Sequence, residues 1–187
     1  IILIRDPRAV AASSFALNGY RYPFLFLCRQ WNKLTSLGIE LEKKFPSQVK
    51  LIKYEDLIFK PNKYLHEICN FLELNFDKSL LNTSDLKDGS NRKWIQNSSH
   101  GESHDSFNKN SINKWTQILD HEKTKFIESI CHDAMSKVRY EFFHEISNKS
   151  RISAIKSFKE IDQGLAEWIK KYSSKKIDFG RQKQAQQ

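Results

Sequence analysis

The chain has 187 residues, 39% of them hydrophobic and 28% charged, and its formal net charge is +9. That length is enough for one domain with a hydrophobic core, whereas no apolar run approaches the roughly 20 residues of a membrane helix. Residues 148–187 carry ten Lys and Arg against four Asp and Glu, so most of the excess charge lies in a basic tail that suits polyanions such as nucleic acid, anionic membrane or sulfated glycan.

The first 15 residues, IILIRDPRAVAASSF, predict a buried strand that passes directly into a helix. Asp6 is a good helix cap, and Pro7 suits the first helical position. A helix start attracts anions, and Arg5 adds a planar fork of donors at the carboxyl end of the strand. Ser13 lies two helical turns beyond Asp6 and returns to the same face. We expect Arg5 and Ser13 to hold one phosphate group; the alternative is a solvated turn.

The segments from residue 23 to residue 72 predict a helix and then a second strand that is followed by a helix. A helix is expected from about residue 23 to 44, with an apolar stripe at three- and four-residue steps formed by Leu27, Trp31, Leu34, Leu37 and Leu41. Residues 49–54 predict a strand, and Pro61 opens an amphipathic helix that continues to Leu72. Strand, helix, strand and helix in this order predict an α/β fold with a parallel sheet.

The second half of the chain predicts mostly helix. We expect a short helix at 76–86, a polar loop at 87–113, a long helix at 115–138 and a basic amphipathic helix at 152–172. His100 and His104 lie in the polar loop without the H-E-x-x-H order of a zinc helix, and the three cysteines lack metal-type spacing. No metal site is therefore expected.

Several of these segments resemble one enzyme family. The run R5-D-P-R-A-V-A-A-S13 is similar to the 3′-phosphate-binding motif of sulfotransferases that use 3′-phosphoadenosine 5′-phosphosulfate (PAPS). The runs Y54-E-D-L-I-F-K-P61 and I127-E-S-I-C131-H-D-A-M135 also match that family, and the RDPRAV spelling is most like its Golgi carbohydrate members of the chondroitin and keratan type. The resemblance covers residues 1 to about 140.

The resemblance implies roles for six residues. Arg5 and Ser13 would bind the 3′-phosphate of PAPS, and Tyr54 would contact the adenine. Lys109, Asn110 and Ser111 match a basic loop that covers the 3′-phosphate. Other interpretations remain open, since Tyr54 can simply close a strand against the core and residues 109–111 can be a solvated loop.

The resemblance also implies a fold and a division of the chain. Residues 1–140 would be the C-terminal part of a sulfotransferase domain with a partial P-loop-NTPase-like parallel sheet flanked by helices, and 141–187 a basic tail. In that family the first strand, the phosphosulfate-binding loop and the catalytic base come earlier in the chain. We therefore expect no catalytic residue and no transferase activity in residues 1–187 alone. PAPS would be the co-substrate, without a metal.

The Golgi members imply a lumenal setting. That resemblance would imply a glycan acceptor, whose hydroxyl receives the sulfuryl group. It would also imply a type II membrane anchor upstream of Ile1. Three N-x-S/T sequons, at Asn82, Asn97 and Asn148, fit a lumenal protein. The positions of Cys28 and Cys131 match cysteines of the carbohydrate enzymes, which would allow a disulfide between them.

Three other functions remain open from the sequence. Tyrosylprotein sulfotransferases share parts of the same pattern. A small-molecule kinase would need a glycine-rich loop, which the six glycines of this sequence do not form. A non-catalytic polyanion-binding module would depend on the basic tail, but the tail lacks the interleaved aromatic pattern of nucleic-acid binders, so no nucleic-acid partner is expected.

Overall fold

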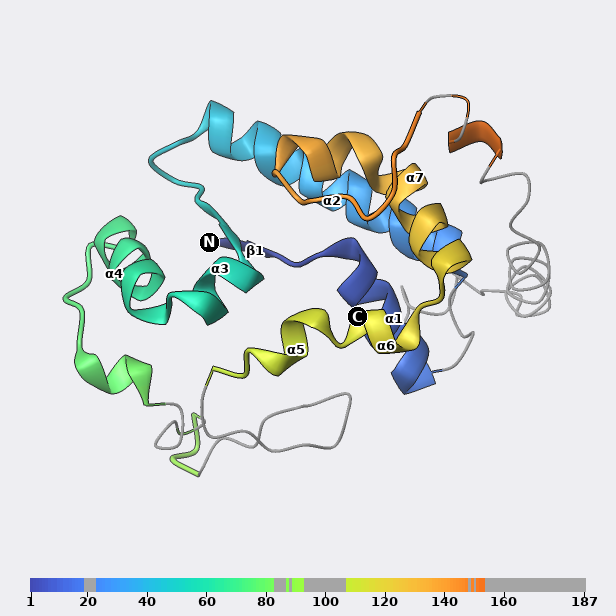
Figure 1. Ribbon diagram of the computed structural model, residues 1–187. Helices are drawn as coiled ribbons and strands as arrows, with labels where there is room; N and C mark the ends of the chain where they lie inside the picture. Colours follow the sequence, from blue (N-terminus) through green and yellow to red (C-terminus); the bar gives the residue numbers. More distant parts are fainter. Residues whose placement is uncertain are drawn as a thin grey trace, which may run out of the picture.

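The computed structural model describes residues 1–18, 23–82, 87, 89–92, 107–147, 149 and 151–153. In chain order (Figure 1), its strands and helices are β1 (Ile2–Ile4), α1 (Pro7–Asn18), α2 (Phe24–Lys44), β2 (Leu51–Lys53), α3 (Tyr54–Phe59), α4 (Pro61–Phe71), a 3₁₀ turn (Lys78–Leu81), α5 (Asn110–Asn113), α6 (Trp115–Ile118) and α7 (His121–Lys137).

The two strands form the parallel sheet that the sequence predicts. Ile2 lies opposite Leu51, and Ile4 lies opposite Lys53. The connection between them runs through α1 and α2, because parallel strands need a long crossover that returns the chain to the same end. The predicted α/β class is therefore confirmed.

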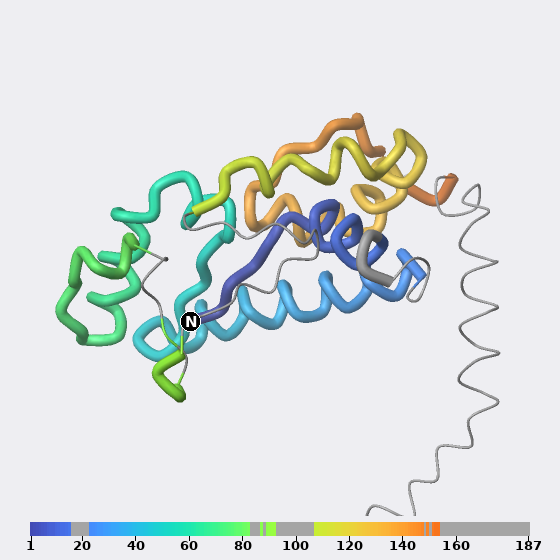
Figure 2. Tube along the Cα trace, turned by 90° about the horizontal axis from the view of Figure 1, so that it is seen from below, coloured from blue at the N-terminus to red at the C-terminus, as the bar shows by residue number. Residues whose placement is uncertain are grey.

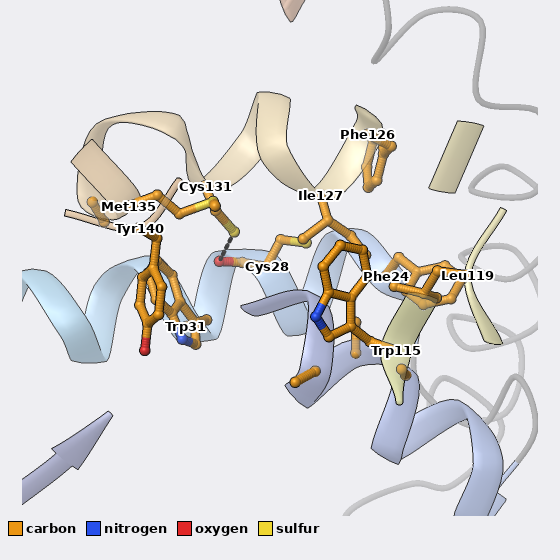
Figure 3. Packing of buried hydrophobic residues seen from close by; sticks show 14 of the residues in the cluster. Phe24, Cys28, Trp31, Trp115, Leu119, Phe126, Ile127, Cys131, Met135 and Tyr140 are labelled. Atoms are coloured by element: carbon orange, nitrogen blue, oxygen red, sulfur yellow. Dashed lines mark hydrogen bonds between the residues drawn. The ribbon is translucent and has the colours of Figure 1, made fainter. Parts of the chain in front are cut away.

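Helices pack against one another around the segment that follows β1. Helix α1 contacts α2, α6 and α7, and the helices α2 and α7, which Figure 1 shows side by side, also pack directly against each other. Figure 2 shows β1 and α1 beside α2. Their shared core (Figure 3) is formed by Ile4, Ala9, Ala11, Ala12, Phe24, Cys28, Trp31, Trp115, Leu119, Phe126, Ile127, Cys131, Ala134, Met135 and Tyr140. The core thus surrounds the strand-to-helix corner at Arg5 and Asp6.

The predicted apolar stripe on α2 is wrong at two positions. Leu34 and Leu37 are 60% and 47% exposed, whereas Thr35 and Gly38 are buried. A Cβ atom at Gly38 would lie 3.2 Å from Leu51 Cδ1, so α2 lies close to the sheet at this glycine. Close packing against the sheet favours small side chains on the inner face of α2. A search for large apolar residues at helical spacing does not find a face of small residues.

Other boundaries also differ from the sequence prediction. The second strand ends at Lys53, and Tyr54 is the first residue of a short helix, α3. The predicted helix at 115–138 is two helices, because Asp120 caps α7 by accepting a hydrogen bond from the Lys123 N–H at 2.8 Å. The predicted helix at 76–86 is a 3₁₀ turn, and the predicted tail helix lies outside the described residues beyond residue 153.

Helices α4 and α7 both end in a Schellman motif with a non-glycine residue in the left-handed conformation. At the end of α7, Arg139 has φ 57°, its N–H donates to Ser136 O, and the Tyr140 N–H donates to Met135 O. Glu73 has φ 57° in the corresponding place after α4. Glycine is the favoured residue here because it has no Cβ to clash.

We expect Arg139→Gly to raise the free energy of unfolding by about 0.5–1 kcal/mol, since relief of the left-handed strain outweighs the extra chain entropy of glycine. Urea unfolding curves would measure the change. The control is Arg29→Gly on the exposed face of α2, which should lower stability by about 1 kcal/mol. A destabilising Arg139→Gly would contradict this account of the helix end.

Candidate functional site

The corner between β1 and α1 is the centre of the site. Asp6 is buried and caps α1, accepting a hydrogen bond from the Arg8 N–H at 2.8 Å, as the sequence predicts. Arg5 is half-buried at the carboxyl end of β1. Open α/β sheets place their ligands at this end of the strands.

Three of the six predicted site residues meet at this corner. An Arg5 Nη2 donates to the Ser111 carbonyl at 2.9 Å, and the guanidinium carbon lies 4.7 Å from the centre of the Tyr54 ring. The Tyr54 hydroxyl and Ser111 Oγ are 3.1 Å apart. Among the described residues, Arg5 Nε is buried without a hydrogen-bond partner. A guanidinium with an unused donor beside two hydroxyls is suited to bind an oxyanion.

The other three predicted residues are described by their position and exposure rather than by a contact with Arg5. Lys109 and Asn110 are exposed, and they lie at the start of α5 rather than in the loop that the sequence predicts. The Asn110 N–H donates to Asn108 Oδ1 at 3.0 Å, which orders this turn. Ser13 lies half-buried within α1. Its joint role with Arg5 stays a prediction.

A buried charge network lies directly behind the corner, and the sequence analysis missed it. Arg8 donates from Nε and Nη2 to the Asp6 carboxylate, and from Nη1 to Glu128 Oε1 at 2.6 Å. All three side chains are buried. Burial opposes the charge of Arg8, but the hydrogen bonds and charges of Asp6 and Glu128 outweigh it and raise the pKa of the guanidinium.

Glu128 also binds the segment that follows α7. Its carboxylate accepts hydrogen bonds from the N–H groups of Phe143 and His144 and lies 2.7 Å from His144 Nδ1. Arg8 lies over the Trp115 ring at 4.4 Å, so an aromatic face covers the ion pair. The sequence feature that could have indicated this network is Glu128, a carboxylate among the apolar residues of the buried face of α7, next to Ile127 and one turn before Cys131.

An apolar cavity of about 450 Å³ adjoins the corner between β1 and α2. Arg5 and Trp31 line it together with Ile2, Leu3, Ile4, Val10, Leu34, Thr35, Leu37, Gly38 and Leu41. The two exposed leucines of α2 therefore border this cavity. Arg5 is its one charged lining residue.

Other predicted features can be compared with the described part of the chain. Cys28, Cys69 and Cys131 are buried free thiols, with Cys131 Sγ 3.8 Å from the Cys28 carbonyl oxygen (Figure 3). Within the described ranges, no group of three or more His, Cys, Asp or Glu side chains could hold a metal ion. None of the helices described here combines the length and hydropathy required to cross a membrane. His100, His104 and the sequons at Asn97 and Asn148 lie outside the described residues.

The sequence profile of one protein family, "Sulfotransferase domain", matches residues 1–139. The chain belongs to the sulfotransferase family. Two solved structures share the fold of this sulfotransferase. The sulfotransferase domain from the curacin biosynthetic pathway is 21% identical with a TM-score of 0.56, and the match covers 75% of this chain and 53% of that one.

The second structure is the sulfotransferase domain from the Synechococcus PCC 7002 olefin synthase, 20% identical with a TM-score of 0.54. That match covers 74% of this sulfotransferase and 48% of its relative. The chain therefore spans about half the length of the solved relatives. The search of curated proteins found no match.

Proposed function

We propose that this sulfotransferase binds PAPS through the Arg5 corner and contributes the nucleotide-binding part of a sulfuryl transfer to an acceptor hydroxyl. The main support is the buried, unused Nε donor of Arg5 beside Tyr54 and Ser111, at the end of a strand and the start of a helix. The family generally uses PAPS as its sulfate donor. A doubly charged 3′-phosphate is the part of that nucleotide that best fits a guanidinium.

Each proposed residue has a distinct task. Arg5 and Ser13 bind the 3′-phosphate, and the Tyr54 ring contacts the adenine. Ser111 adds a hydroxyl at the same place, and its carbonyl ties α5 to Arg5. Lys109 and Asn110, exposed at the start of α5, supply a cation and an amide that can cover the bound phosphate.

Sulfuryl transfer in line to a hydroxyl needs positioning, donors for the charge on the leaving phosphate and a base for the hydroxyl proton. The residues proposed here supply the positioning, because they bind the 3′-phosphate and the adenine rather than the 5′-phosphate from which the sulfuryl group leaves. We assign the base to none of them. Since the chain spans about half of its relatives, turnover by residues 1–187 alone is not expected.

We further propose a carbohydrate hydroxyl as the acceptor. The support is the RDPRAV run and the I127-to-M135 segment, which resemble Golgi carbohydrate sulfotransferases. This proposal places the protein in the Golgi lumen with a membrane anchor outside the present sequence. It rests on sequence resemblance alone, whereas the nucleotide site is also supported by the arrangement of Arg5, Tyr54 and Ser111.

The test is a comparison of nucleotides by isothermal titration calorimetry. Adenosine 3′,5′-bisphosphate should bind about 10- to 100-fold more tightly than adenosine 5′-phosphate, because the 3′-phosphate adds charge-assisted hydrogen bonds. ATP serves as the control for a kinase-like site, since it has more charge but no 3′-phosphate. Equal binding of the first two nucleotides, or a preference for ATP, would contradict the proposal.

A further inference from the structure

Both polar groups of the Arg5–Asp6 peptide are held by buried side chains. The Trp31 Nε1–H donates to the Arg5 carbonyl oxygen at 2.8 Å. On the other side of the same peptide, the Asp6 N–H donates to Glu55 Oε1 at 2.9 Å. Trp31 comes from α2 and Glu55 from α3, so two separate elements fix one peptide plane.

Tyr140 completes this arrangement. Its hydroxyl donates to Glu55 Oε2 at 2.7 Å, and its ring centre lies 6.3 Å from that of Trp31, beside it in Figure 3. Trp31, Glu55 and Tyr140 are only 8–9% exposed. Burial and the nearby Glu55 carboxylate raise the pKa of Tyr140, so its hydroxyl keeps the proton that it donates.

Tyr140 is itself held in place by β2. Lys53 Nζ lies 4.6 Å from the centre of the Tyr140 ring and 3.3 Å from the Arg139 carbonyl oxygen. The end of α7 is thereby tied to the strand beside β1. The hydrogen bonds of Trp31 and Glu55, with Tyr140 behind Glu55, thus converge on one peptide next to the proposed phosphate ligand.

We propose that Trp31, Glu55 and Tyr140 are positioning residues that fix the Arg5–Asp6 peptide and so direct the Arg5 side chain toward the 3′-phosphate. This inference rests on the proposed function. A peptide plane held at both its C=O and its N–H restricts the backbone angles on either side, and these angles set the direction of the Arg5 Cα–Cβ bond. An arginine placed in advance loses less entropy when it binds the phosphate.

The decisive variant is Tyr140→Phe, which keeps the ring packed on Trp31 but removes the hydroxyl from Glu55. Affinity for adenosine 3′,5′-bisphosphate should fall about tenfold, because a misplaced arginine loses its aligned hydrogen bonds. Affinity for adenosine 5′-phosphate should change less than about twofold, since it lacks the phosphate that Arg5 binds. An equal loss for both nucleotides would overturn the positioning role and indicate a structural one.

Tyr64→Phe is the matched control. The Tyr64 hydroxyl also bonds a carboxylate, that of Asp56, but it lies on α4 outside the corner. This variant should leave the preference for the 3′-phosphate unchanged. Glu55→Gln should retain most of that preference, because the amide oxygen can still accept from Asp6 and the amide nitrogen can donate to Tyr140. Glu55→Ala should lose it.

Amide hydrogen exchange followed by NMR separates failure of this inference from failure of the proposed function. In Tyr140→Phe, exchange of the Asp6 N–H and of the Trp31 indole N–H should accelerate about tenfold without any nucleotide. If the unmodified protein shows no preference for the 3′-phosphate, the proposed function fails, and this exchange still tests the hold on the peptide. Unchanged exchange at both groups would overturn the positioning role whatever the nucleotide results.

Discussion

Replacing Arg8 by Met is expected to lower the free energy of unfolding by about 3–5 kcal/mol, which is the cost of breaking a buried ion pair. Arg8 is the shared partner of two buried carboxylates, Asp6 and Glu128, and the variant leaves both without their counter-charge. Methionine retains much of the arginine stem, so the loss reflects the missing guanidinium more than a cavity. For a domain of this size, such a loss is a large fraction of the total stability.

Urea unfolding followed by circular dichroism would measure this loss. The matched control is Arg151→Met, since Arg151 also makes two hydrogen bonds to one carboxylate, that of Asp133, but at the surface. The control should lower stability by less than about 1 kcal/mol, as exposed ion pairs do. Similar losses in the two variants would show that burial of the Arg8 network does not determine its contribution.

Replacing Arg5 by Gln is expected to abolish most of the preference for a 3′-phosphorylated nucleotide. The affinity for adenosine 3′,5′-bisphosphate should fall about 30- to 100-fold, since each lost charge-assisted hydrogen bond is worth about 1.5–3 kcal/mol. Glutamine can still donate to the Ser111 carbonyl, which limits the structural disturbance. The affinity for adenosine 5′-phosphate should fall less than about threefold, because Arg5 does not bind that nucleotide's only phosphate.

Titration calorimetry with both nucleotides measures this change in preference. Arg29→Gln on the exposed surface of α2 removes the same charge away from the corner and controls for nonspecific electrostatics. Its preference should match that of the unmodified protein. If Arg29→Gln and Arg5→Gln behave alike, the binding depends on net charge and the assignment of the corner is wrong.

Much of the fold was accessible from the sequence because its signals are local. The apolar residues of β1, the cap at Asp6 and the proline at position 7 can be recognised from the neighbouring sequence, before any distant partner is known. Prediction failed where packing decides. Gly38 and Thr35 lie on the buried face of α2, because a close approach of this helix to the sheet requires small side chains. That requirement depends on β1 and β2, which are not adjacent to Gly38 in the sequence.

The candidate site was only partly accessible for the same reason. The resemblance to sulfotransferase motifs identified Arg5, Tyr54 and Ser111 as candidates, and the structure brings these three together. The sequence assigned no role to Arg8, because its partner Glu128 is 120 residues away. A buried ion pair between such distant residues leaves no periodic pattern that a reader of the sequence can recognise.

The long sequence separations within the corner also have a consequence for biosynthesis. Ser111 follows its partner Arg5 by 106 residues, and Glu128 follows its partner Arg8 by 120 residues, so both partners emerge from the ribosome much later than the corner. Chains are made at about 5–20 residues per second, so the early strand waits several seconds for these partners. During that interval Arg5 lacks the Ser111 carbonyl and Arg8 lacks the Glu128 carboxylate, so the corner is completed only after α7 has been made.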